Sequence, residues 1–100
     1  MVFYNNHSSG PISTEELTFQ ATVVRQEYGN NPGNKLYVEN VIGLDNDYKR
    51  DHNILRLRKK DAVLDLERYT IVFTGNLQKY WDKALTPKMG IRYIKIKDIS

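Results

Sequence analysis

Two groups of basic and aromatic residues are the part of this 100-residue sequence that suggests chemistry. Arg56 and Arg58 alternate with leucines, so in a strand both arginines project from the same face. The run Lys79, Tyr80 and Trp81 places a cation beside two large aromatic side chains at the end of another alternating segment. Because cations follow phosphates and aromatic rings stack on bases, this combination indicates binding of a single-stranded nucleic acid.

The predicted binding surface combines these residues with an outward tyrosine and two further lysines of the following loop. Its central members also fit purely structural roles: Tyr80 and Trp81 could pack the end of a barrel, since tryptophan is usually largely buried. The two arginines could instead pair with acids across a sheet. The full predicted set is Tyr37, Arg56, Arg58, Lys79, Tyr80, Trp81, Lys83 and Lys88.

The charge is distributed unevenly along the chain. Residues 1–47 carry two Lys/Arg against six Asp/Glu, a formal charge of −4. Residues 48–100 carry thirteen Lys/Arg against six Asp/Glu, a formal charge of +7. A basic half of this kind is the electrostatic pattern of a polyanion binder, although a solvated basic surface would look the same.

Residues for catalysis or metal binding are scarce in this sequence. There is no cysteine, His7 lacks companion ligands, and His52 and Asp51 would point to opposite faces of a strand. The glycine-rich segment 29–33 lacks the Lys-Ser/Thr of a phosphate-binding loop, and Asp45–Asp47 lacks the glycine and glutamate of a calcium loop. We therefore expect no enzyme activity, no cofactor and no metal.

Alternation of apolar and polar residues predicts five strands. The first contains Leu17, Phe19, Ala21 and Val23 on its buried face, and the second has Leu36, Val38, Ile42 and Leu44 on one face. Glycine in the fourth strand, at position 75, indicates a bend or a close backbone approach. The predicted strands are Leu17–Tyr28, Leu36–Leu44, Asp51–Arg58, Glu67–Trp81 and Ile91–Ile99.

Apolar spacing in Lys59–Glu67 predicts one short helix between the third and fourth strands. The predicted fold is mainly all-β, a five-stranded Greek-key barrel of the OB type, with an SH3-like barrel as the other small β-rich possibility. We expect residues 1–14 to form a flexible arm and residues 15–100 to form a single domain.

The chain resembles small OB-fold proteins that bind single-stranded nucleic acid, of the type carried by phages and mobile elements. The resemblance covers about residues 17–98 and is carried by Phe19-x-Ala21-x-Val23, Asp51-His52 and Phe73-x-Gly75-x-Leu77-x-x-Tyr80. In that family, binding uses strands two and three and the loops that join strands one to two and four to five. The resemblance implies single-stranded DNA, favoured over RNA, as the ligand, and a replication or recombination protein as a further partner.

A second function remains open on the sequence alone, because OB-type barrels also serve as protein-interaction or inhibitor modules. An outward apolar patch of Val41, Ile54 and Val72 would favour this alternative. A barrel-type ribonuclease is a third and weaker option, since this sequence lacks the acid–base groups that such an enzyme needs. Edge strands of a partly open barrel can also pair two copies into a homodimer. The absence of cysteine, of a signal peptide and of a membrane span predicts a cytoplasmic protein.

Overall fold

Five strands and one 3-10 turn make up the described part of the chain, which in this computed structural model comprises residues 15–27, 35–81 and 87–100. The side chains at positions 80, 81, 87 and 88 are outside this description. The predicted arm 1–14, the glycine-rich loop and Lys83 also lie outside the described residues. The elements are β1 (Leu17–Glu27), β2 (Lys35–Gly43), β3 (Lys49–Arg56), η1 (Lys59–Asp61), β4 (Thr70–Trp81) and β5 (Pro87–Ile99).

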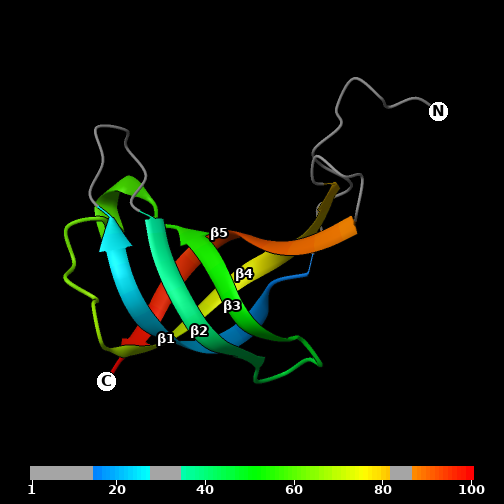
Figure 1. Cartoon of the computed structure of the whole chain (residues 1–100), viewed down its shortest axis with the longest axis horizontal. Coiled ribbons are helices and arrows are strands. Elements are labelled where there is room, and N and C mark those ends of the chain that lie inside the picture. Colours follow the sequence, from blue (N-terminus) through cyan, green and yellow to red (C-terminus); the bar gives the residue numbers. More distant parts are fainter. Residues whose placement is uncertain (1–14, 28–34, 82–86) are drawn as a thin grey trace.

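The strands form one sheet in the order β3-β2-β1-β4-β5, with every neighbouring pair antiparallel (Figure 1). The predicted all-β class is therefore confirmed. The two edge strands, β3 and β5, approach each other, but no hydrogen-bonded pairing joins them among the described residues. The sheet is thus strongly curved without being closed into a barrel.

The core is organised around β1, which pairs with β2 on one side and with β4 on the other. Phe19, Ala21 and Val23 are buried, as their alternation predicts. The Phe19 ring stacks on Phe73 of β4, with ring centroids 5.4 Å apart and planes inclined by 20°. Burial of large apolar side chains from both strands supplies the main stabilisation of the curved sheet.

The predicted inward face of β2 is wrong beyond Val38. Asn40 adopts a left-handed backbone conformation with a φ of 53° and lies at an irregularity in the pairing with β1. An extra residue of this kind reverses the side-chain alternation. As a result Val41, predicted to face outward, is buried, whereas Ile42 and Leu44 are exposed.

Gly75 marks a close approach of β4 to β5, as the sequence indicates. A Cβ atom added at this position would lie 2.5 Å from Cγ2 of Ile91 and 3.0 Å from the carbonyl oxygen of Arg92. Any side chain would therefore push the two strands apart. The absence of a side chain therefore lets β5 approach β4 closely at the irregular part of their pairing.

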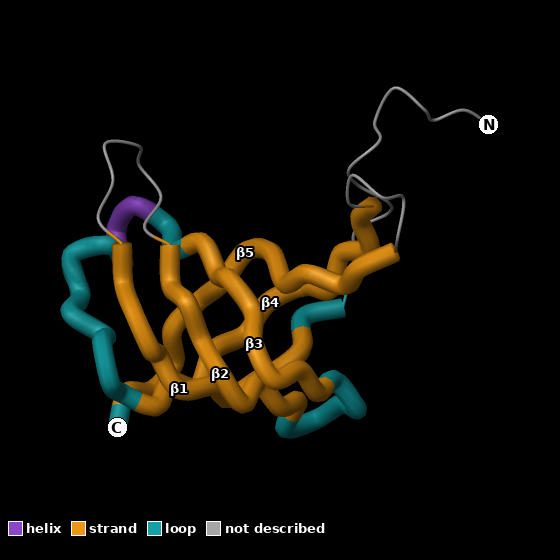
Figure 2. Tube along the Cα trace, viewed as in Figure 1, coloured by secondary structure: helices purple, strands orange, loops and turns teal. Residues whose placement is uncertain are grey.

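The helix predicted at Lys59–Glu67 is not formed: only a single 3-10 turn is present, and its N-cap residue Arg58 makes no side-chain capping bond. The chain then continues along β1 (Figure 2). The buried side chain of Gln26 accepts a hydrogen bond from the Leu66 amide at 2.8 Å and donates to the Leu64 carbonyl at 2.8 Å. These two bonds stabilise an extended backbone, because they engage an amide and a carbonyl that would bond to other backbone groups in a helix.

No helix among the described residues is long and apolar enough to cross a bilayer.

We expect Gln26→Leu to lower the free energy of unfolding by about 2–4 kcal/mol, because it leaves the buried Leu66 amide and the partly buried Leu64 carbonyl without these partners. Urea unfolding monitored by circular dichroism measures this loss. The matched control is Gln20→Leu on the same strand, where the glutamine is only partly buried. Equal unfolding free energies for the two variants would contradict the role assigned to Gln26.

The bend after β2 is tied to the start of β1 by a carboxylate. Oδ1 of Asp45 accepts hydrogen bonds from the Thr18 amide at 2.9 Å and from Nδ2 of Asn46 at 2.8 Å. Asn46 also bonds the Thr18 carbonyl and the Tyr48 amide. The bond from the Thr18 backbone, followed by that from Asn46, lowers the pKa of Asp45 below its ordinary value of 3.8.

Acid should therefore weaken this attachment. Since the folded pKa is depressed, the contribution of Asp45 is fully present above the ordinary pKa and is lost as the pH falls through the folded value. We expect Asp45→Asn to be less stable than the natural protein at neutral pH, with a difference that shrinks below about pH 4. Unfolding free energies measured across about pH 2–7 test this, with Asp47→Asn as the exposed control. A pH-independent difference would contradict it.

Candidate functional site

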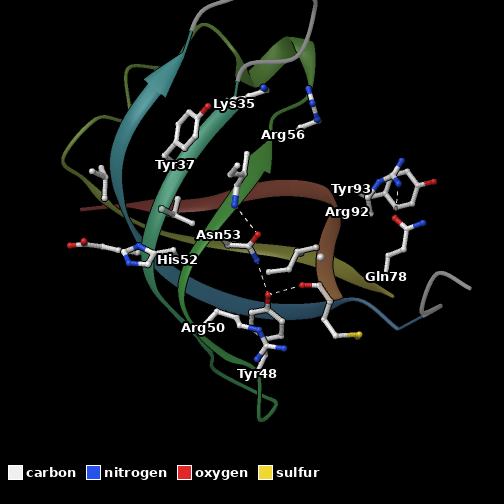
Figure 3. A pocket seen from close by; sticks show the side chains of 17 residues that line it. Lys35, Tyr37, Tyr48, Arg50, His52, Asn53, Arg56, Gln78, Arg92 and Tyr93 are labelled. Atoms are coloured by element: carbon white, nitrogen blue, oxygen red, sulfur yellow. Dashed lines mark hydrogen bonds between the residues drawn. The ribbon is translucent and has the colours of Figure 1, made fainter. Parts of the chain in front are cut away.

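A concave groove of about 1310 Å³ lies between the β2–β3 pair and the first half of β5 (Figure 3). Its lining on one side comes from both faces of β2 and β3, including the buried Val38, while β5 and Gln78 of β4 form the opposite side. The curvature of the sheet brings these segments together although they are far apart in the sequence. The groove is therefore a product of tertiary structure.

The groove is positively charged. Among its lining residues are four Lys/Arg side chains and a single carboxylate, Glu39. None of the four cations forms an ion pair with a carboxylate of the described residues. Their charges are consequently available to an anionic ligand. The four are Lys35, Arg50, Arg56 and Arg92.

Three tyrosines also line the groove, and each has an arginine over its ring. The guanidinium of Arg50 lies 5.0 Å from the Tyr48 ring centroid, and that of Arg92 lies 5.9 Å from the Tyr93 ring centroid. Tyr37 is covered by Arg25 at 4.2 Å. Tyr37 is partly exposed and Tyr93 is exposed, so these rings and their guanidinium partners are surfaces on which bases can stack, whereas the Tyr48 ring is buried in the core.

A short hydrogen-bond chain crosses the groove between the two sheet edges. Nδ2 of Asn53 donates to the Tyr48 hydroxyl at 2.7 Å, and this hydroxyl donates to the Met89 carbonyl at 3.1 Å. Oδ1 of Asn53 accepts from the amide of Ile54 at 2.7 Å. Tyr48 thus links β3 to β5, two edges that share no strand pairing within the described ranges.

Two of the residues predicted from the sequence meet in this groove: Tyr37 on β2 and Arg56 on β3. Arg58 is not among the lining residues and instead makes a salt bridge with Asp61, with 3.0 Å between Nη2 and Oδ2. Lys79 is exposed on β4, also away from the lining.

The other predicted residues belong to the far end of the β4–β5 hairpin. Tyr80 pairs with Lys88 in the strand register, and Trp81 pairs with Pro87. The side chains of Tyr80, Trp81 and Lys88 lie outside the description, as does Lys83 entirely. Their proximity to the groove stays a prediction.

The set predicted from the sequence does not include several residues of the groove, namely Tyr48, Arg50, Gln78, Arg92 and Tyr93. The reason is clearest on β5, where adjacent residues of a regular strand face opposite ways. The lining residues of β5 are nevertheless consecutive, from Met89 to Tyr93, and Tyr93 has a φ of 59°, a left-handed conformation that interrupts the regular strand. The adjacent Arg-Tyr pair in the basic half is the signal available in the sequence.

The described residues contain no group of three or more His, Cys, Asp or Glu side chains that could hold a metal ion. His52 is exposed on β3 opposite Glu39 of β2, and both line the groove. Comparison of the chain with protein-family models, with curated proteins and with solved structures gave no match.

We expect Tyr48→Phe to lower the free energy of unfolding by roughly 1–2 kcal/mol, because the variant removes the hydroxyl that joins Asn53 to the Met89 carbonyl. Chemical denaturation gives this value directly. Tyr69→Phe, which alters an exposed tyrosine, is the matched control and should change stability little. If both variants unfold at the same denaturant concentration, the cross-groove bond contributes nothing to stability.

Proposed function

We propose that the protein binds single-stranded nucleic acid in this groove, without catalysis, and that DNA is favoured over RNA. One observation carries the proposal: four cations and three tyrosines line the same concave surface. None of these four cations forms an ion pair with a carboxylate of the described residues. The sequence resemblance to OB-fold single-strand binders points to the same ligand.

The chemistry of the groove fits a flexible polyanion with exposed bases. Lys35, Arg50, Arg56 and Arg92 can each neutralise a phosphate, which releases counterions and makes affinity fall as salt rises. Stacking on the accessible rings of Tyr37 and Tyr93 requires unpaired bases, because the bases of a duplex are already stacked on one another. These two features together favour a single strand over a duplex.

The strand arrangement supports an OB-like interpretation. β1 pairs with β2 and β4, and the third and fifth strands approach each other. A closed OB barrel would add a β3–β5 pairing to this order. The groove lies over β2 and β3, which are the strands that bind nucleic acid in the resembling family.

The alternative of a protein-interaction module depends on an outward apolar patch. One of its three members, Val41, is buried, whereas Ile54 and the neighbouring Val24 are each about half exposed at the groove. An apolar pair within a basic groove can also contact bases. We therefore retain nucleic acid as the proposed ligand.

Replacement of groove arginines should weaken binding and its salt dependence. For Arg50→Ala with Arg56→Ala, we expect the slope of log affinity against log salt to become shallower by about 0.7 for each phosphate that is no longer neutralised. Fluorescence anisotropy of a labelled, mixed-sequence strand of roughly 16 nucleotides, titrated at several salt concentrations, measures this. RNA of the same sequence and a DNA duplex are compared in parallel.

Arg58→Ala together with Lys95→Ala is the charge-matched control, because both residues are ion-paired away from the groove lining. This control should retain most of the affinity. Absence of binding by any single strand at low salt would contradict the proposed function. Equal losses in the two double variants would show that the binding surface lies elsewhere.

A further inference from the structure

One end of the groove combines a buried amide, an arginine and an exposed aromatic ring. Gln78 of β4 lines the groove although it is only 5% exposed, and Arg92 and Tyr93 of β5 lie beside it (Figure 3). Tyr93 is 57% exposed, so much of its side chain is accessible to a ligand. A glutamine is seldom buried at a strand surface unless its polar atoms are used.

The hydrogen-bonding capacity of this cluster is one-sided. Nη1 of Arg92 donates to Oε1 of Gln78 at 2.5 Å, which occupies the amide oxygen. Within the described part of the chain, the Gln78 side chain makes this one hydrogen bond. Its two Nε2 donors therefore have no partner among the described residues. Arginine has donors only. The cluster therefore offers mainly donors next to an aromatic ring, and its remaining side-chain acceptors are the second lone pair of Oε1 and the Tyr93 hydroxyl, which can also donate.

We propose that Gln78, Arg92 and Tyr93 form a base-recognition subsite that takes guanine. This inference deepens the proposed function and rests on it. Guanine presents two neighbouring acceptors, O6 and N7, on one edge, whereas adenine and cytosine present an amino donor at the corresponding place. A guanine stacked on the Tyr93 ring would direct its acceptor edge toward the Arg92 and Gln78 donors.

A phosphate would also accept from these donors, but it would leave the aromatic ring without a role. The backbone at the subsite is irregular, because Tyr93 adopts a left-handed conformation where the pairing of β4 with β5 shifts its register. Such a conformation is unfavourable for a non-glycine residue and is concentrated at functional sites.

The test uses oligothymidine strands of roughly 12 nucleotides with one central guanine, adenine or 7-deazaguanine, titrated by anisotropy against the full chain. We expect the guanine strand to bind roughly 5- to 100-fold more tightly than the adenine strand. The 7-deazaguanine strand, which lacks the N7 acceptor and keeps O6, should lose much of that preference. A phosphate site would not distinguish these strands.

Gln78→Glu replaces the donor amide with an acceptor of nearly the same shape and should abolish the guanine preference. Gln20→Glu adds the same charge on β1, away from the groove lining, and should preserve it. Equal binding of the guanine and adenine strands would overturn this inference and leave the proposed function standing. A guanine preference that survives Gln78→Glu or the 7-deaza substitution would overturn the assignment, and failure of every strand to bind would overturn both proposals.

Discussion

Tyr48 connects the hydrophobic core to the groove, and the shape of both depends on its position. Its buried ring packs edge-to-face on Phe19, with centroids 5.5 Å apart, and Phe19 in turn stacks on Phe73. Its hydroxyl reaches the Met89 carbonyl on the opposite sheet edge. A residue that is apolar at one end and polar at the other suits this boundary. The distance between the groove walls is therefore set by core packing.

The same curvature that encloses the core also concentrates charge. β3 and β5 are the two edges of the sheet, and their approach brings Arg50 and Arg56 to face Arg92 across the groove. Like charges so placed repel one another, a cost that an anionic ligand would remove. Edge strands are exposed to unwanted pairing, and positive side chains along them oppose it. The positive charge of the groove thus opposes edge pairing and would be neutralised by the anionic ligand that we propose.

Irregular backbone positions decide which side chains face the groove. Asn40 reverses the alternation of β2, Gly75 permits β5 to approach β4 closely, and Tyr93 interrupts the regular strand β5. The extended connection after η1 is likewise fixed by Gln26 from another strand. Except for the glycine at position 75, the alternation of apolar and polar residues within each segment does not indicate these features. This is why the predicted helix and the predicted inward face of β2 are wrong.

The sequence by itself determined the five strands, their antiparallel class and most of the core, because alternation of apolar residues reports which face of a strand is buried. It also indicated the close approach at Gly75, and it grouped Tyr37 with Arg56, both of which line the groove. Only the tertiary structure decided that Arg50, Arg92 and Gln78 line the same groove, and that Arg58 pairs with Asp61 outside it. The physical reason is that a groove between two sheet edges depends on curvature and backbone irregularities, which arise from contacts between distant strands.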